Sequence, residues 1–475
     1  MFANATNFLY GIPVFDFSKV SFGPATLSLL QQGNLAAPSQ SMITIMSDNS
    51  WPVYVTGPNT VVFQMIHPYG QLLSLLTAPI SLLFEPNYVL QHGGPGAPGS
   101  PNSNLELSPP PGTGPYVISS VVENSRYVYV KNPTYWGNTL SPSDIAANGA
   151  LDPGHFQTIV INYVTDGSVR YVDLTQGRVQ LSEILGSNFE IFLQTHDPNY
   201  NFITFGKYSA AGQAFLSMNT LRPPLNNRDL RLAIVHAVNT TQIIDQAVFG
   251  YGDTYFGPET PIYGNYYNPS NYSPYDYNLT EASNYLTLAG YPNGKGLAPI
   301  TLNIDNVAPW EEVAAELIQS DLAQIGITVN IEVLSFPTFL STFYSSYSTM
   351  AATPSIQMAL DSCYAYFPDY ISPTDYLGQF TTNQSSYGNF ALYNSDSTYT
   401  AFQTFISSNN PATLTQAMTS AETQIYHDAP YDWLFLPRLY LVGGSYVYNT
   451  QVVHNLYIEP NIFGESDLPL LNTIS

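Results

Sequence analysis

Apolar residues in the second half of the chain follow a strand period and a helical period in turn. The run Ile-Thr-Leu-Asn-Ile at 300–304 is typical of a strand, and from Trp310 to Gln324 apolar residues recur every three or four positions, as in an amphipathic helix. Gly326 follows this helix, and residues 328–334 predict a second strand. This order predicts a parallel strand pair with a right-handed crossover. Four apolar side chains are expected on the inner side of the helix: Val313, Leu317, Ile318 and Leu322.

The same patterns predict further elements along the chain. Residues 60–66 predict a buried strand, and residues 116–118 and 127–130 predict two antiparallel strands joined by a polar turn. Residues 93–111 are dense in Gly, Pro, Ser and Asn, and residues 255–277 are dense in Tyr, Pro and Asn, so both are expected to be loops. The remaining predictions are helices at 72–83, 169–174, 228–247 and 414–427, and strands at 158–163, 179–184 and 433–436.

The composition narrows the possible partners. A chain of 475 residues is long enough for two or three domains. Lys and Arg number 11 against 34 Asp and Glu, so the formal net charge is −23, and only 9% of the residues are charged. The chain has no run of Lys or Arg that could displace counterions from phosphates, which excludes nucleic acid as a partner. The negative charge also argues against binding to anionic lipid.

The low number of charges has two explanations. Amide and hydroxyl groups keep a surface hydrated without ionising, so the composition suits an acidic exterior. A lineage with generally few charged residues is the other explanation, and both stay open. A sharp loss of stability below about pH 4, where carboxylates protonate, would contradict the first one.

Cysteine content and hydropathy exclude several further classes. Cys363 is the only cysteine, so no intramolecular disulfide and no cysteine-based zinc site can form, and we expect a small buried residue at this position. No run of about 18–20 apolar residues predicts a membrane span. The N-terminus lacks the basic region and apolar core of a secretion signal.

Motifs of catalysis are absent from the sequence. The seven histidines do not stand at metal-ligand spacing, and neither a nucleophile elbow nor a phosphate-binding or dinucleotide-binding loop occurs. The pair Glu311-Glu312 is interpreted as the solvated face of its helix. The sequence therefore predicts a protein that is not an enzyme and has no metal or cofactor.

Six short segments stand in a fixed order in the chain. They are Gly112–Tyr116 with Asn132–Gly137, Leu174–Gln180, Met218–Asn239, Ala289–Gly294, Leu322–Ile327, and Phe367–Tyr370 with Asn389 and Tyr393. Together they resemble the dipeptide, oligopeptide and nickel class of solute-binding proteins of ABC transporters, which is family 5 of the extracellular solute-binding proteins. One departure is Gln180, which stands where the family carries an acid.

The resemblance implies an α/β fold, the periplasmic-binding-protein type II fold, with two lobes, a hinge and an extra small domain. It also implies a monomer that captures a small-molecule ligand by hinge closure and delivers it to ABC permease subunits in the membrane. We predict that lobe I is incomplete. The predicted ranges are a partial small extra domain at 1–111, lobe I at 112–218, lobe II at 219–436, and a return to lobe I at 437–475.

The resemblance departs from the family at both ends. Little sequence precedes Gly112, and the chain stops at Ser475 without the Ser/Thr-rich stalk and membrane helix of archaeal relatives. We therefore expect an archaeal chain that is truncated at its N-terminus. It is expected to be extracellular, at the outer face of the cytoplasmic membrane, although this chain carries no signal or anchor.

The resemblance also points to a ligand site. In the family, the aspartate at the position of Asp369 pairs with the amino group of a bound peptide, and the preceding aromatic residue, Tyr366 here, packs against the ligand. The alternative role of Asp369 is to cap a turn before Pro373. The predicted ligand-binding residues are Asp369, Tyr366, Tyr364, Asn389, Trp310 and Trp433. For the aromatic members, core packing is the alternative.

Three functions stay open at this point. A peptide receptor needs a cation for the carboxylate of the peptide, and Lys and Arg are scarce here. An oligosaccharide receptor needs no such cation, and the 37 tyrosines could stack on sugar rings. A secreted glycoside- or peptide-processing enzyme is the alternative outside the receptor class; a glycosidase would need two carboxylates about 5–10 Å apart across a cleft.

Overall fold

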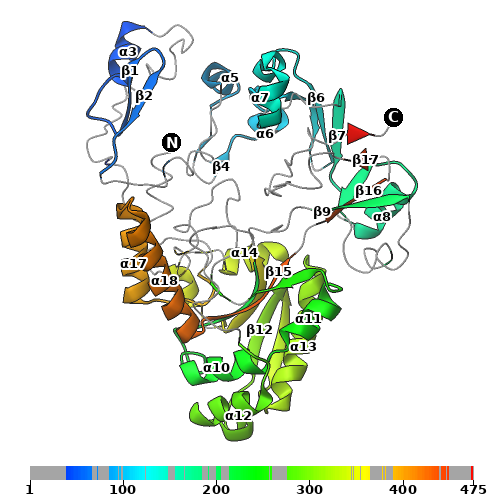
Figure 1. Ribbon diagram of the computed structural model, residues 1–475, viewed down its shortest axis with the longest axis vertical. Coiled ribbons are helices and arrows are strands. Elements are labelled where there is room, and N and C mark those ends of the chain that lie inside the picture. Colours follow the sequence, from blue (N-terminus) through cyan, green and yellow to red (C-terminus); the bar gives the residue numbers. More distant parts are fainter. Residues whose placement is uncertain are drawn as a thin grey trace. The chain divides into compact units, whose positions relative to one another are not determined.

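The computed structural model forms two compact units (Figure 1). Unit 1 consists of Met1–Phe15, Met65–Ile80 and Tyr208–Leu439, and unit 2 consists of Asp16–Gln64, Ser81–Lys207 and Tyr440–Ser475. The structure describes residues 39–66, 85–94, 100–123, 125–147, 156–164, 166–183, 199–204, 213–255, 275–343, 347–353, 355–363, 389–437 and 440–444, with a few isolated positions and pairs outside these ranges. The mixed α/β class agrees with the predicted fold class.

Unit 1 contains a six-stranded mixed sheet with the strand order β11-β15-β10-β14-β12-β13. Its strands are β10 (Gln213–Met218), β11 (Gly252–Thr254), β12 (Ile300–Asp305), β13 (Val329–Leu334), β14 (Met358–Cys363) and β15 (Tyr431–Pro437). β12 pairs in parallel with β13 and β14, whereas β10 pairs antiparallel with β14 and β15. The path from β12 through one helix into the parallel strand β13 confirms the parallel pair predicted from the sequence.

Helices cover the sheet of unit 1 (Figure 1). They are α10 (Arg228–Ala237), α11 (Thr240–Ala247), α12 (Leu279–Leu288), α13 (Pro309–Gln324), α14 (Phe336–Phe343), α15 (Tyr347–Ala352), α17 (Asp396–Ser407) and α18 (Pro411–Asp428). Strand residues Leu216, Leu302 and Leu360 form one apolar cluster with Ile234 of α10 and Ile318 of α13, and all five are fully buried. Burial of one such side chain contributes about 1.5–3 kcal/mol, so this cluster stabilises the packing of α10 and α13 on the sheet.

A second apolar cluster is aromatic. Phe215 of β10 lies edge-on to Phe390 at 5.4 Å and to Tyr431 at 5.0 Å between ring centres. Phe339 and Phe343 of α14 pack on the same Phe390. Since Leu216 and Phe215 are neighbours in one strand, their side chains point to opposite faces, so this cluster lies on the other face of the sheet.

The predicted helical region 228–247 is two helices. Val238 leaves the helical conformation, and Asn239 caps α11 by accepting a hydrogen bond from the Gln242 backbone N–H at 3.2 Å. The backbone N–H of Asn239 donates to Asp321 of α13 at 2.9 Å. Apolar periodicity continues through both helices, so the pattern alone does not reveal the break.

The buried side of α13 differs from the prediction. Ile318 is fully buried, but Val313 is 36% exposed. Glu311 has no exposed surface, which contradicts its interpretation as part of a solvated face, whereas Glu312 is exposed. Glu311 lies two helical turns before Ile318, so the helical period itself directs both side chains inward.

Two glycines of the family segments touch each other. Gly294 ends the 3-10 turn η6 (Pro292–Gly294) with φ +71°, and Gly326 follows α13 with φ +91°. A Cβ atom on Gly294 would lie 1.8 Å from the carbonyl oxygen of Gly326. Both positions therefore require glycine, for the backbone angle and for the close approach.

Unit 2 consists of small antiparallel sheets and short helices. The strands β5 (Tyr116–Val122), β6 (Arg126–Lys131) and β7 (Thr158–Asn162) form one sheet, and β8 (Leu181–Glu183), β16 (Tyr440–Gly444) and β9 (Tyr200–Thr204) form another. The pairing of β5 with β6 confirms the predicted antiparallel strands at 116–118 and 127–130. Further elements of unit 2 are α3 (Gln40–Met46), α5 (Pro86–Gln91), α7 (Pro142–Ala147), α8 (Gly167–Thr175), η2 (Trp136–Thr139), β17 (Val447–Tyr448) and β18 (Asn472–Thr473).

Two predictions for the N-terminal part are wrong. The predicted buried strand at 60–66 is β2 (Thr60–Phe63), a hairpin partner of β1 (Val53–Gly57), and its Val61 is 57% exposed. The predicted loop at 93–111 contains the strand pair β3 (Gly96–Ala97) and β4 (Ser100–Pro101) and the helix α6 (Ser103–Leu107). The predicted helix at 72–83 lies, apart from Leu72, outside the described residues.

Candidate functional site

The sheet of unit 1 has two ends with different chemistry. At one end stand Gln213 of β10, Asp305 of β12, Cys363 of β14 and Pro437 of β15. In the sequence, β10 begins shortly after one of the changes between the units, Lys207–Tyr208, and β15 ends shortly before another, Leu439–Tyr440, so we call this end the crossing end. The opposite end, at Met218, Ile300, Met358 and Tyr431, is the far end.

Parallel strands direct attention to the crossing end. In open α/β sheets, ligands bind beyond the carboxyl ends of the parallel strands. β12, β13 and β14 all end at the crossing end. This end of the sheet is therefore the candidate ligand site of unit 1.

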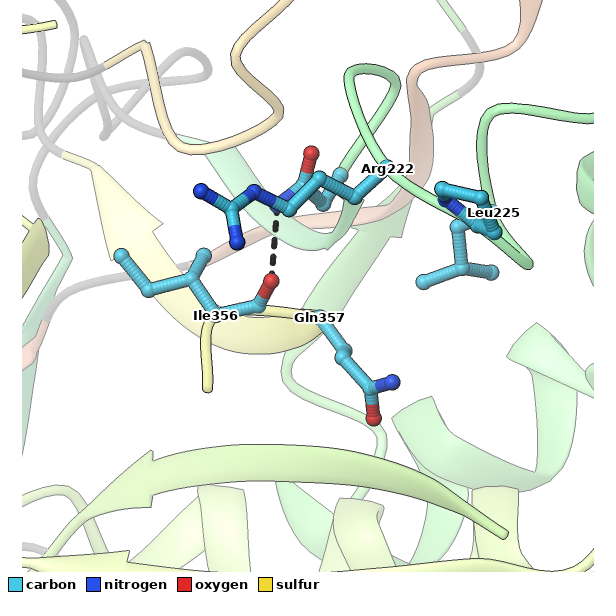
Figure 2. A pocket seen from close by; sticks show the side chains of 6 residues that line it. Arg222, Leu225, Ile356 and Gln357 are labelled. Atoms are coloured by element: carbon cyan, nitrogen blue, oxygen red, sulfur yellow. Dashed lines mark hydrogen bonds between the residues drawn. The ribbon is translucent and has the colours of Figure 1, made fainter. Parts of the chain in front are cut away.

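The far end is braced by hydrogen bonds. A pocket of about 360 Å³ lies there, lined by Asn219, Arg222, Pro223, Leu225, Ile356 and Gln357 (Figure 2). The Asn219 side chain donates to the carbonyl oxygen of Ile356 at 2.7 Å, drawn as the dashed line in Figure 2, and its backbone N–H donates to Gln357 at 2.8 Å. Arg222 donates to the carbonyl oxygen of Ala351. These bonds join the loop after β10 to the segment before β14, so the pocket residues brace the fold.

Arg231 anchors the same end of the sheet. Its side chain is 5% exposed, and its Nε donates to the carbonyl oxygens of Asp428 at 3.0 Å and Ala429 at 3.1 Å. Its Nη1 donates to the carbonyl oxygen of Leu225 at 2.8 Å. Burial lowers the pKa of this guanidinium to about 10. The planar fork of arginine thus satisfies carbonyl groups that the end of α18 leaves open.

Three buried carboxyl groups stand at the crossing end. Asp305 ends β12 and is 6% exposed, Asp361 lies level with it on β14 and is 8% exposed, and Glu311 in the first turn of α13 has no exposed surface. Glu311 Oε2 accepts a hydrogen bond from the Asp305 backbone N–H at 2.9 Å. Burial, and after it the charges of Asp361 and Asp305, raise the pKa of Glu311 to about 10. Glu311 is therefore a neutral acid at pH 7.

A fourth buried carboxyl group lies inside the sheet. Asp432 of β15 is 2% exposed, and burial raises its pKa well above the ordinary range. Its Oδ2 has no hydrogen-bond partner in the part of the chain that the structure describes. Unit 1 thus contains at least two buried carboxyl groups, Glu311 and Asp432, whose pKa values burial raises.

The predicted site residues that the structure describes separate into two groups. Trp310 is half-buried at the crossing end, where its ring meets Phe435 edge-on at 5.3 Å. Trp433 is 2% exposed and packs in the sheet beside Tyr431. Asn389 is 1% exposed, donates to the carbonyl oxygen of Tyr393 at 2.8 Å and accepts from its N–H at 2.9 Å. Only Trp310 is brought to the surface of the crossing end.

Tyr364, Tyr366 and Asp369 lie outside the described residues. They follow β14 in the chain, and β14 ends at the crossing end. Their roles in ligand binding stay predictions.

Comparison with known proteins places the chain in a family. Residues 30–388 match the model of the middle part of family 5 of the bacterial extracellular solute-binding proteins. The chain belongs to this family. The resemblance carried by the six segments is thereby confirmed.

Two curated relatives and one solved structure illustrate the family match. The chain is 29% identical over 237 residues to the nickel-binding periplasmic protein of Escherichia coli and 30% identical over 229 residues to the heme-binding protein A of Haemophilus influenzae. Each match covers 47% of this chain, but only 42% and 37% of the two relatives. The periplasmic binding protein DppA of Helicobacter pylori, solved with the peptide STSA, is 22% identical and has a TM-score of 0.67 over 89% of this chain and 73% of its own.

Two features are absent from the residues that the structure describes, a cluster of metal-binding side chains and a membrane-spanning helix. Among the described residues, no group of three or more His, Cys, Asp or Glu side chains is arranged to hold a metal ion, and this includes the carboxyl groups at the crossing end. Within the same part of the chain, no helix is long and apolar enough to cross a bilayer.

Proposed function

We propose that this family 5 chain is the ligand-capturing subunit of an ABC importer. It works outside the cell, takes an oligopeptide between two lobes, and releases it unchanged to permease subunits in the membrane. The proposal rests on the family match over residues 30–388 together with the division of the chain into two units. A ligand that contacts both lobes stabilises the closed state, which is the basis of capture.

The two lobes of the proposal correspond to the two compact units. We assign the hinge to two of the five changes between the units, Lys207–Tyr208 before β10 and Leu439–Tyr440 after β15. The carboxyl ends of β12 and β14 lie at the same end of the sheet as the start of β10 and the end of β15. We infer that a monomer is sufficient for capture, because the proposed site uses residues of a single chain.

An oligopeptide is the proposed ligand because of the charge at the site. By resemblance, the carboxylate of Asp369 meets the ammonium group of a peptide, and the described residues of the crossing end add Asp305 and Asp361. The half-exposed ring of Trp310 offers an apolar wall. An oligosaccharide is a second candidate, favoured by the 37 tyrosines and by the low content of Lys and Arg.

A ligand screen tests the proposal. The purified chain is heated with di- to pentapeptides, cello- and malto-oligosaccharides and nickel, and a shift of the melting temperature identifies binders. We expect peptides to raise the melting temperature and to return intact after long incubation, as measured by mass spectrometry. Cleavage above a control without protein would overturn the receptor function, and a response to sugars alone would overturn the peptide.

The substitution Asp369→Asn tests the proposed ammonium contact. Because a charge-assisted hydrogen bond is lost, we expect peptide binding to weaken by about 2–5 kcal/mol. For a sugar ligand the loss should be about 1 kcal/mol, since asparagine keeps one acceptor oxygen. Titration calorimetry measures both values, with the exposed Asp245→Asn as control. Unchanged affinity would leave Asp369 with its alternative role as a turn cap.

A further inference from the structure

Glu311 occupies an unusual position for a carboxyl group. It stands in the first turn of α13 with no exposed surface, and its Oε2 accepts the Asp305 backbone N–H at 2.9 Å. Its Oε1 is buried and has no hydrogen-bond partner among the residues that the structure describes. An ionised carboxylate in this position would hold half of its charge on an oxygen without a donor, which is strongly unfavourable.

The neighbours of Glu311 carry the same sign of charge. Asp305 contributes from β12 and Asp361 from β14, and the described residues supply no basic side chain that shifts Glu311 in the opposite direction. On α13 itself the next residue, Glu312, is exposed to solvent. Asp305 Oδ1 already accepts the backbone N–H groups of Val307 at 2.6 Å and Ala308 at 2.9 Å. Asp305 thus acts as an acceptor, and a further negative charge beside it is disfavoured.

The same contacts hold the turn between β12 and α13. Asp305 closes residues 306–308 through its side chain, and Glu311 reaches back to the Asp305 backbone. Ala308, at the helix start, provides no side-chain cap. Trp310, the predicted ligand contact, is the second residue of α13 and directly follows this turn. The position of Trp310 therefore depends on Glu311 remaining in the interior.

We propose that Glu311 is a proton-operated latch: while it carries a proton it stays buried and keeps the turn from β12 to α13 closed, and loss of the proton releases the turn with Trp310. The latch contributes most to the stability of unit 1 at low pH. It does not depend on the identity of the ligand or on the receptor function.

The direction of the pH dependence follows from proton binding. The ordinary pKa of glutamic acid is about 4.3, and in the folded protein burial, with Asp361 and Asp305, raises it to about 10. The stability that the buried proton provides is complete below about pH 4 and is lost as the pH rises toward the folded pKa. Between these two pKa values the folded state holds one proton more than the unfolded state. The equilibrium constant of unfolding therefore rises up to tenfold for each unit by which the pH rises.

The experiment compares two neighbouring substitutions. Glu311→Gln keeps the shape and remains neutral, whereas Glu312→Gln removes the charge of an exposed residue in the same turn. Denaturant unfolding is measured between pH 5 and pH 9 for the unmodified chain and both variants, with tryptophan fluorescence as the signal. We expect the unfolding constant of the unmodified chain and of Glu312→Gln to rise with pH, and the slope of Glu311→Gln to be smaller by up to tenfold per pH unit.

A second variant keeps the test decisive if Glu311→Gln does not fold. Asp361→Asn removes one of the two charges that oppose ionisation of Glu311. In the native state without denaturant, the fluorescence change of Trp310, obtained as the difference from Trp310→Phe, should occur on the alkaline side. Asp361→Asn makes ionisation of Glu311 easier, because it removes a negative charge that raises the pKa of Glu311. The midpoint for Asp361→Asn should therefore lie below that of the unmodified chain. Equal slopes for Glu311→Gln and the unmodified chain, or a midpoint unaffected by Asp361→Asn, would overturn the latch.

Discussion

The far end and the crossing end of the sheet in unit 1 differ in the polar side chains that they bury. At the far end, Asn219, Arg222 and Arg231 place their donors on backbone carbonyl oxygens of neighbouring loops. At the crossing end, Asp305, Asp361 and Glu311 bring three carboxyl groups together in the interior. The first arrangement strengthens the fold, and the second costs stability unless a proton or a ligand offsets the charge.

The comparison shows where the family segments act. The segment Met218–Asn239 supplies Asn219 and Arg231, and the segments Ala289–Gly294 and Leu322–Ile327 supply the contact between Gly294 and Gly326, all near the far end. The residues that identify the family in the described part of unit 1 are thus mostly those that build it. We expect residues of the crossing end, where family segments are few, to determine which ligand is bound.

The largest effect is expected at the glycine contact. In Gly294→Ala the new Cβ would meet the Gly326 carbonyl oxygen at 1.8 Å, so the two loops must separate. With the unfavourable left-handed backbone, we expect a loss of about 4–5 kcal/mol in the free energy of unfolding, the upper range for one substitution. Denaturant unfolding measures it.

Gly296→Ala is the control for this prediction. Gly296 has φ +86°, but a Cβ atom there would meet nothing within 4 Å. The expected loss is only the backbone cost of about 1–2 kcal/mol. Similar losses for both glycines would show that the close approach of Gly294 and Gly326 contributes nothing.

The two tryptophans separate packing from binding. Trp433→Ala should cost about 3–4 kcal/mol in the free energy of unfolding, because a 2% exposed indole leaves a cavity. Trp310→Ala should cost about 1–2 kcal/mol, since it loses mainly an edge-on contact with Phe435. Ligand affinity, measured by calorimetry with a peptide from the screen, should fall for Trp310→Ala. Full affinity in that variant would remove Trp310 from the site.

The substitution Arg231→Lys at the far end should reduce the free energy of unfolding by less than Trp433→Ala does. Arg231→Lys retains a cation, but one ammonium cannot reach the carbonyl oxygens of both Leu225 and Asp428. We expect a loss of about 2 kcal/mol in the free energy of unfolding. Arg228→Lys on the exposed side of the same helix is the control: its Nε donates one exposed hydrogen bond, to the carbonyl oxygen of His427, which a lysine can replace, so the free energy of unfolding should change by less than about 0.5 kcal/mol. Equal losses would contradict a special role of the buried fork.

The sequence predicted much of unit 1 because its strong patterns are local. The strand at 300–304, the helix at 310–324 and the strand at 328–334 lie where the periodicity of apolar residues puts them, since their buried sides face one core. The hairpin at 116–130 was equally readable from alternation and a polar turn. The family resemblance then supplied the fold that these pieces compose.

The remaining features depend on contacts that local patterns do not contain. The break at Val238 is fixed by Asp321, which is distant in sequence and binds the Asn239 backbone. Two adjacent acids suggest a solvated face, and for Glu311 this prediction is wrong, because the helical period that buries Ile318 also places Glu311 on the inner side of α13. At the site, Trp433 and Trp310 look alike in the sequence, and only the pairing of β15 in the sheet distinguishes them.

The buried acid Glu311 also changes how the protein exchanges heat with its buffer. With a folded pKa of about 10 it holds a proton that an unfolded chain gives up at pH 7. Melting in an unbuffered solution should therefore acidify it. In a calorimeter, the apparent enthalpy of unfolding should differ between phosphate and Tris, because the released protons are taken up with a different enthalpy by each. The difference counts the acids that folding keeps neutral.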